Sequence, residues 1–329
     1  MQEIRIILMS MIAATLALIA TPVAAQTPEK YPDRAVRLVA PFAPGASTDA
    51  AARRLAAALT PLLGQQVVVD NRTGGAGSIG STEVARARPD GHTLIFATVS
   101  THILNQLLMK NVPYSSLKDF SYVALLGTNT TSLAVHPTVT TSLPDLIRRV
   151  KAMPSKYSYG SSGHGSILHL AGELFKLQAG KLDIVHVPYR GSGNSVMDVI
   201  AGQLPIGIMA LGTSIPHHRA GKLKVLAAFS EKRSGVALDI PTGIELGVPN
   251  LISYSCVLLA APAGTPKPII DMLHQATMRV VNDEVFQKDL LALGFDPVID
   301  STPQKTTQFI RDELAKWAPI AKATGIEPN

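Results

Sequence analysis

The segment VRLVAPFAPGASTDAAARRLAAAL, residues 36–59, carries the pattern that decides the fold. Aliphatic residues at 36–40 predict a buried strand, and one face of the helix expected to follow it is marked by Leu55, Leu59, Leu62 and Leu63. A turn rich in Pro, Gly, Ser and Thr separates the two. A strand that leads directly into a helix is the repeating unit of α/β proteins with parallel sheets.

The same unit recurs along the chain. Strand patterns occur at 67–70, 93–98, 157–160 and 184–187, each near a helical pattern, and a strand-like run at 133–136 precedes the helix-start signature Ser142-Leu143-Pro144-Asp145. Further strand and helix patterns reach about residue 230, followed by an apolar strand at 255–261 and two helices that start after Pro266 and Pro303. The last helix is expected to bury four side chains: Phe309, Ile310, Leu314 and Trp317.

Length and composition narrow the function classes. At roughly 100 to 200 residues per domain, 329 residues predict about two domains. Lys and Arg exceed Asp and Glu by 30 − 24 = 6, but the basic residues are spread along the chain, which argues against nucleic acid as a partner. The single Cys256 excludes a disulfide framework and is expected in the core. His217-His218 has no third ligand at metal spacing, so we expect this pair at the surface and no metal site. We also expect no cofactor and a monomer.

The first 25 residues have the pattern of a secretory signal. Arg5 precedes an uncharged run at 6–20, and Val23-Ala24-Ala25 supplies the small residues of a cleavage site. The run of about 15 residues is shorter than the ~20 that a membrane-spanning helix needs. Cleavage after Ala25 would leave 329 − 25 = 304 residues beginning at Gln26.

Four strand-to-helix turns are predicted to form a ligand site, because ligands of open α/β sheets bind at the carboxyl ends of strands. Their glycines admit close approach, their hydroxyl and imidazole groups donate hydrogen bonds, and the helix N-termini favour an anion. For any one turn, ordinary capping is the favoured explanation, and the recurrence at four separate turns is what favours a ligand site. The predicted ligand-binding residues are Phe42, Gly45, Ala46, Ser47, Thr48, Asp49, Ser100, Thr101, His102, Ser161, Gly163, His164, Ser166, Tyr189, Gly191 and Ser192.

The one acid among these turns limits the choice of ligand. Asp49 lies four residues before Arg53, so we expect the two side chains to pair on one helical face. A ligand ammonium would then lack a carboxylate partner, which favours a small mono- or dicarboxylate. The alternative is that Asp49 or backbone carbonyl groups accept an ammonium.

An enzyme is the rival interpretation. Residues 75–80 read G-x-G-x-x-G after a strand, the spacing of a dinucleotide site and of a nucleotide-dependent oxidoreductase. The next strand ends Ile95-Phe96-Ala97-Thr98, with no acid to hold a ribose, and the chain contains no G-x-S-x-G. We therefore expect a protein without catalytic residues.

The chain resembles the Bug family, the extracytoplasmic receptors of tripartite tricarboxylate transporters, over the whole chain that would follow cleavage. The resemblance is carried by Tyr31-Pro32, Pro41-Phe42-Ala43-Pro44-Gly45 with Asp49, Asp70-Asn71-Arg72, Pro89-Asp90-Gly91-His92, Tyr159-Gly160-Ser161-Ser162-Gly163, His169-Leu170-Ala171-Gly172-Glu173-Leu174-Phe175, His186-Val187-Pro188-Tyr189-Arg190-Gly191 and Ala261-Pro262-Ala263-Gly264-Thr265-Pro266. Two departures bear on the ligand: Ala46 follows Gly45 where the family often has Gly-Gly, and Pro205 and Met209 stand where many members have acids.

The resemblance implies a type II periplasmic binding protein of the Venus-flytrap kind, an α/β protein with two domains, each a mostly parallel sheet flanked by helices. Domain 1 would comprise 26–127 and 255–329, domain 2 would comprise 128–254, and the chain would cross between them near Gly127 and Tyr254. Such a protein captures a small organic carboxylate between its domains in the periplasm and delivers it to the membrane permease subunits of the transporter.

Overall fold

The computed structural model describes residues 31–45, 47–189 and 191–323. The predicted signal peptide lies outside these residues. Contacts within the chain separate residues 1–33 from residues 34–329, and every element named below belongs to the second unit. Within the described part of the chain, no helix is both long and apolar enough to span a bilayer.

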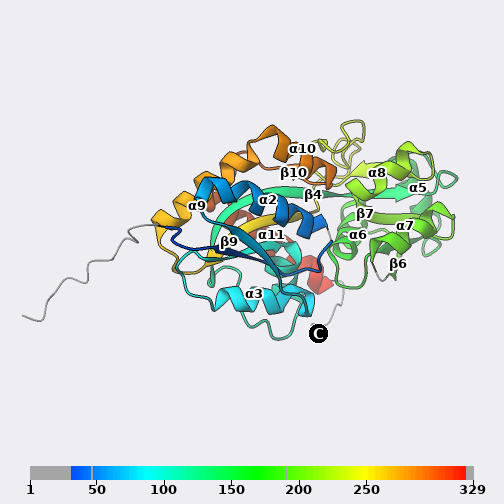
Figure 1. Ribbon diagram of the computed structural model, residues 1–329. Coiled ribbons are helices and arrows are strands. Elements are labelled where there is room, and N and C mark those ends of the chain that lie inside the picture. The colour runs from blue at the N-terminus through cyan, green and yellow to red at the C-terminus, as the bar shows by residue number, and fades with distance from the viewer. Residues whose placement is uncertain (1–30, 46, 190, 324–329) are drawn as a thin grey trace, which may run out of the picture. The chain divides into compact units, whose positions relative to one another are not determined.

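The first part of the chain alternates strands and helices as predicted (Figure 1). Its elements are β1 (Val36–Ala40), α2 (Ser47–Leu63), β2 (Val67–Asn71), the short turn η1 (Gly75–Gly77), α3 (Ser78–Ala85), β3 (Thr93–Thr98), the π-helical turn η2 (Ser100–Leu104) and α4 (Asn105–Leu108). The helical segment after β3 is therefore a π turn continued by one α turn, since α4 ends at Leu108.

The remaining elements begin with one long strand. They are β4 (Phe120–Val135), α5 (Leu143–Ala152), β5 (Ser158–Ser161), α6 (Ile167–Gln178), β6 (Val185–Pro188), α7 (Ser192–Ile200), β7 (Ile206–Ala210), α8 (Leu211–Arg219), β8 (Lys224–Ala228), β9 (Tyr254–Pro262), α9 (Lys267–Val281), α10 (Glu284–Ala292), β10 (Asp296–Pro297) and α11 (Pro303–Ala323). The predicted start of α5 is confirmed: Ser142 is its N-cap and accepts a hydrogen bond from the amide of Asp145.

The sheet is mixed. The prediction of parallel strands is confirmed for β1 with β2 and β3, and for β5 with β6 and β7. It does not extend to β9, which is antiparallel to β3 and β4, or to β4, which is antiparallel to β7 and β8. Most residues of β4 and β9 are buried, so their apolar runs resemble those of parallel strands and carry no signal of direction.

Strand β4 links the two parts of the sheet. Its residues from Phe120 to Thr130 pair with β9, while those from Thr131 to Val135 pair with β7 and β8. The last pair between β4 and β9 joins Thr130 to Tyr254. We call the strands and helices on the β9 side of this change, with α9 to α11, the first half, and those from Thr131 to Ser253 the second half (Figure 1).

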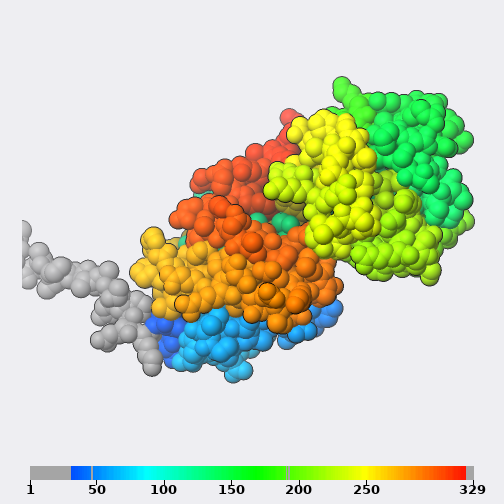
Figure 2. Space-filling model, turned by 90° about the horizontal axis from the view of Figure 1, so that it is seen from above, coloured from blue at the N-terminus to red at the C-terminus, as the bar shows by residue number. Residues whose placement is uncertain are grey.

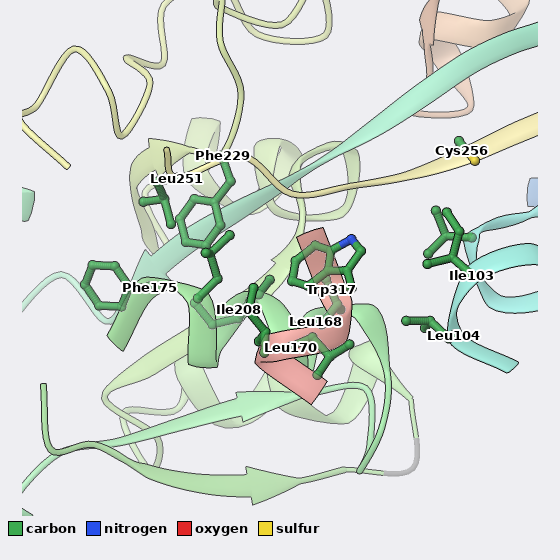
Figure 3. Close-up of a cluster of buried hydrophobic side chains, with 14 of the residues drawn as sticks. Ile103, Leu104, Leu168, Leu170, Phe175, Ile208, Phe229, Leu251, Cys256 and Trp317 are labelled. Atoms are coloured by element: carbon green, nitrogen blue, oxygen red, sulfur yellow. The ribbon is translucent and has the colours of Figure 1, made fainter. Parts of the chain in front are cut away.

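Helix α11 of the first half also packs against α6 of the second half. Trp317 and Ile310 are fully buried, and Phe309 and Leu314 are partly buried, as the apolar face predicted. Trp317 lies between Leu168 and Leu170 of α6 and the side chains of Ile103 and Leu104 (Figure 3). One hydrophobic core therefore continues across the change of strand pairing, and Cys256 lies fully buried within it.

A polar contact also joins the halves. Asp296 of β10 accepts hydrogen bonds from the Ser234 hydroxyl at 2.6 Å and the Gly235 amide at 2.7 Å. In Figure 2 the segment after β8, coloured yellow to yellow-green, reaches the orange C-terminal elements. The sequence did not predict α10 as a separate helix, because only Phe286 and Leu290 of its nine residues are buried.

Candidate ligand-binding site

A groove of about 260 Å³ lies between the halves, where the turn from β5 to α6 faces η1, η2 and α4. Its wall on the second half consists of His164, Gly165 and Ser166. A side chain at Gly165 would come within 3.5 Å of Leu108, so the two walls approach closely. The wall on the first half is formed by Ala76, Ser100, Leu104, Asn105, Leu108 and Met109.

Three predicted site residues line this groove: Ser100, His164 and Ser166. Ser166 is the N-cap of α6: its hydroxyl accepts from the amide of His169 and donates to the carbonyl of Gly163 at 2.8 Å. The groove therefore meets the positive end of a helix, which favours an anion.

The buried side chain of Ser161 stabilises the turn from β5 to α6 through hydrogen bonds. Its hydroxyl is fully buried, lies 2.8 Å from Nε2 of His186, and bonds with both the amide and the carbonyl of Gly163. Gly163 has a φ of 131°, which an L side chain rarely adopts. The Ser161 side chain thus fixes the shape of the turn, and Gly163 supplies its backbone freedom.

Asp49 organises the turn from β1 to α2. Its carboxylate accepts from Arg53 Nε at 3.0 Å, Asn71 Nδ2 at 2.8 Å and the Gly45 amide at 2.9 Å. The predicted pairing of Asp49 with Arg53 is confirmed. Burial alone would raise the pKa of Asp49, but the hydrogen bonds from Arg53, Asn71 and Gly45 hold the pKa below its ordinary value.

Asn71 also donates to the carbonyl of Phe42, at 3.0 Å, so this amide ties β2 to the first turn. Within that turn Phe42 and Thr48 are half-buried, while Gly45 and Ser47 are exposed. Ala46 lies outside the described residues.

The structure does not bring Thr101 and His102 to the groove. Both side chains are fully buried, because η2 turns them toward the sheet. The Thr101 hydroxyl closes a turn on the amide and carbonyl of Thr98, and the His102 ring packs 4.5 Å from the ring of Phe120. Burial lowers the pKa of His102 to about 3, so the ring is a neutral part of the core.

Polar groups of the turn after β6 are also hydrogen-bonded to other groups of the protein. The Tyr189 hydroxyl donates to Asp198 at 2.7 Å, and the Gly191 amide donates to the carbonyl of Ser162 at 3.2 Å. Gly191 precedes α7 with a φ of 103°, so the glycine is required there. Arg190 and the side chain of Ser192 lie outside the described part of the chain.

Sequence reasoning missed six residues that line the groove: Ala76, Leu104, Asn105, Leu108, Met109 and Gly165. Ala76 belongs to the G-x-G loop, whose glycines permit close packing: a side chain at Gly77 would lie 2.6 Å from Thr101 and 3.3 Å from Pro41. Asn105 donates to the carbonyl of Ala76 at 3.3 Å. The glycine motif was therefore the sequence signal that could have pointed to Ala76. Close packing of the loop explains the glycines, so they do not require a bound nucleotide.

Three histidines gather behind the groove, with one nitrogen of each lying within 4.8 Å of the others: His164, His169 and His186. The rings of His169 and His186 stack at 3.8 Å with 10° between their planes. Imidazole lone pairs lie in the ring plane, so those of two stacked rings run side by side. The Gly165 amide bonds to Nδ1 of His169, and Ser161 contacts His186. This packing differs from three nitrogens converging on one ion.

A larger hollow of about 560 Å³ lies beside α11 and suits an anion less well. Glu231, Asp312 and Glu313 line it together with Lys316. Lys316 is already paired with Glu313 and lies 5.1 Å from the centre of the Tyr254 ring. A carboxylate placed there would meet three acids, whereas His164 is the one titratable side chain among the described residues that line the groove.

Comparison with known proteins gives the class of this protein, a solute-binding receptor of the periplasmic kind. Residues 51–326 match the model of the tripartite tricarboxylate transporter family receptor, and the chain belongs to that family. Protein BugT of Bordetella pertussis is 37% identical over 309 residues, which cover 93% of each chain. The resemblance to Bug proteins is thereby confirmed.

Solved structures give the same result. A protein of R. palustris with adipate is 34% identical, with a TM-score of 0.75, and the match covers 91% of this chain and 100% of that chain. MatC from Rhodopseudomonas palustris with bound malate is 30% identical, with a TM-score of 0.71, covering 88% of this chain and 100% of that one.

Proposed function

We propose that this receptor captures a small organic carboxylate in the groove between two domains and delivers it to the membrane permease of a tripartite tricarboxylate transporter. Domain 1 comprises residues 26–127 and 255–329, and domain 2 comprises residues 128–254. The observation that carries the proposal is the groove itself, where Ser100 and Asn105 face the capped start of α6 at Ser166. The Ser100 hydroxyl on one wall and the start of α6 on the other suit an anion held from both sides.

The proposed ligand has no ammonium group. Asp49 is buried and already holds three donors, so it offers no free acceptor to a ligand cation. A buried ammonium without an acceptor costs several kcal/mol. Adipate and malate in the two related structures support a mono- or dicarboxylate here.

The predicted site residues divide into two proposed roles. Asp49, Thr101, His102, Ser161 and Tyr189 position the turns, since their side chains are engaged within the protein. Direct contact with the ligand is proposed for Phe42, Gly45, Ala46, Ser47, Thr48, Ser100, Gly163, His164, Ser166, Gly191 and Ser192.

A thermal-shift panel tests the ligand class. At 100 times its dissociation constant, a ligand adds about 2.7 kcal/mol to the free energy of unfolding, which corresponds to a rise of roughly 5 °C. We expect that rise with at least one of adipate, malate, succinate and citrate, and none with NAD. The variant Ser100→Phe, whose ring fills the groove, should unfold normally and lose the shift. Stabilisation by amino acids but by none of the ammonium-free carboxylates would refute the ligand class.

The proposal includes export and delivery. We propose cleavage after Ala25, so N-terminal sequencing of the periplasmic protein should read Gln26 first; an intact Met1 on exported protein would contradict cleavage.

Delivery predicts that vesicles containing the permease take up labelled carboxylate only when the receptor is added. The carboxylate should be recovered chemically unchanged, because a receptor without catalytic residues only binds it.

A further inference from the structure

His164 occupies a special position in the groove. Its ring is exposed on the groove wall, while its inner side faces two other imidazoles: the ring centres lie 4.9 Å from His169 and 6.2 Å from His186. The three rings come from the β5–α6 turn, from the first turn of α6 and from β6. An anion in the groove would therefore meet one end of a row of three histidines.

The two inner histidines are held neutral. Burial, reinforced by the neighbouring histidines and Lys176, lowers the pKa of His169 to about 3. Burial likewise lowers the pKa of His186 to about 4, although Glu173 opposes this. Neither buried ring gains a proton near neutral pH. His164 is the exposed member of the row.

The charges that surround the row are already balanced. Glu173 of α6 accepts from the Tyr159 hydroxyl at 2.8 Å and pairs with Lys176 at 2.8 Å. Across the groove the described lining residues are uncharged. Arg190 lies outside the described residues. In the described surroundings, a ligand carboxylate would be the counter-ion that His164 otherwise lacks.

We propose that His164 takes up a proton from solvent when a carboxylate binds, and that the resulting imidazolium donates to the ligand. This inference rests on the proposed function and adds a residue that selects for ligand charge. The proton returns to solvent when the ligand leaves. Since the ligand favours the protonated form, binding strengthens as pH falls toward the range in which histidine is charged, and weakens as pH rises.

Calorimetry measures the proton directly. The carboxylate with the largest shift in the thermal panel is titrated at about pH 7.5 in HEPES and in Tris, whose ionisation enthalpies differ. The dependence of the observed enthalpy on the buffer gives the number of protons taken up. We expect about 0.5 to 1 proton for the natural chain, and a dissociation constant about tenfold weaker at pH 8.5 than at pH 6.5.

Two variants make the test specific. His164→Gln keeps a hydrogen-bond donor but cannot be charged, so its proton uptake should be near zero and its affinity independent of pH. His217→Gln, on α8 and outside the groove lining, should behave as the natural chain. Carboxylate binding without proton uptake, or uptake that persists in His164→Gln, would overturn the role of His164. Absence of binding by every carboxylate would instead overturn the proposed function.

Discussion

Replacing Trp317 by Ala is expected to lower the free energy of unfolding by about 3 to 5 kcal/mol, the usual cost of removing a large buried aromatic side chain. Trp317 is fully buried and packs in one cluster with Leu168 and Leu170 of the second half and Ile103 and Leu104 of the first. Its indole N–H donates to Glu313 at 2.8 Å, so the substitution also strips a donor from a buried carboxylate. Urea unfolding followed by circular dichroism measures the loss.

Two further variants separate volume from hydrogen bonding. Trp317→Phe keeps most of the ring but leaves Glu313 without the indole donor. Its free energy of unfolding should therefore lie between that of the natural chain and that of Trp317→Ala. Gln308→Ala, at an exposed position of the same helix, should change stability by less than about 0.5 kcal/mol. An unfolding midpoint for Trp317→Ala equal to that of the natural chain would show that α11 does not anchor the core.

Replacing Asp49 by Asn is expected to weaken carboxylate binding by about tenfold or more and to lower stability by about 1 to 3 kcal/mol. The neutral amide cannot accept equally well from Arg53, Asn71 and the Gly45 amide, so the turn from Phe42 to Thr48 loses its internal support. Calorimetric titration gives the affinity and urea unfolding gives the stability. Asp271→Asn is the matched control, because Asp271 pairs with Lys267 at the same i,i+4 spacing but its side chain is 45% exposed, whereas that of Asp49 is 4% exposed.

The same carboxylate gives the stability difference a defined pH dependence. Because the folded-state pKa of Asp49 lies below its ordinary value, its stabilisation is complete above the unfolded-state pKa and is lost as pH falls through the folded-state pKa. The stability gap between the natural chain and Asp49→Asn should therefore shrink as pH falls from about 7 to about 3. A gap that stays constant or widens over that range would argue against a charged Asp49 in the folded state.

Local patterns predicted the strands and helices well because their signals lie within a few residues. The pairing of Asp49 with Arg53 follows from helical spacing, and the cap at Ser142 follows from the residues beside it. The direction of β9 depends on partners far away in sequence, β3 and β4, and its apolar residues are compatible with either direction. No local pattern could reveal it.

The residues of the candidate ligand-binding site were predicted less well, because the direction of a side chain also depends on parts of the chain beyond its immediate neighbours. Small polar residues at strand ends marked Ser100, His164 and Ser166, all of which line the groove. The same residue types at Thr101 and His102 enter the core, and their direction depends on a π turn that the sequence did not indicate. Asn71 donates a hydrogen bond to Asp49, which lies 22 residues earlier in the sequence. The two residues come together only because β1 pairs with β2, which no local pattern predicts.

Closure of the groove around a carboxylate is best tested by small-angle X-ray scattering of the chain, beginning at Gln26, with and without the strongest carboxylate of the panel. The predicted ligand-binding turns at residues 42–49 and 161–166 can engage one small anion from both sides only if the two proposed domains approach each other. We predict a smaller radius of gyration at saturation, and no change for Ser100→Phe at the same ligand concentration. A profile of the natural chain that stays the same at saturating carboxylate would contradict capture between two domains.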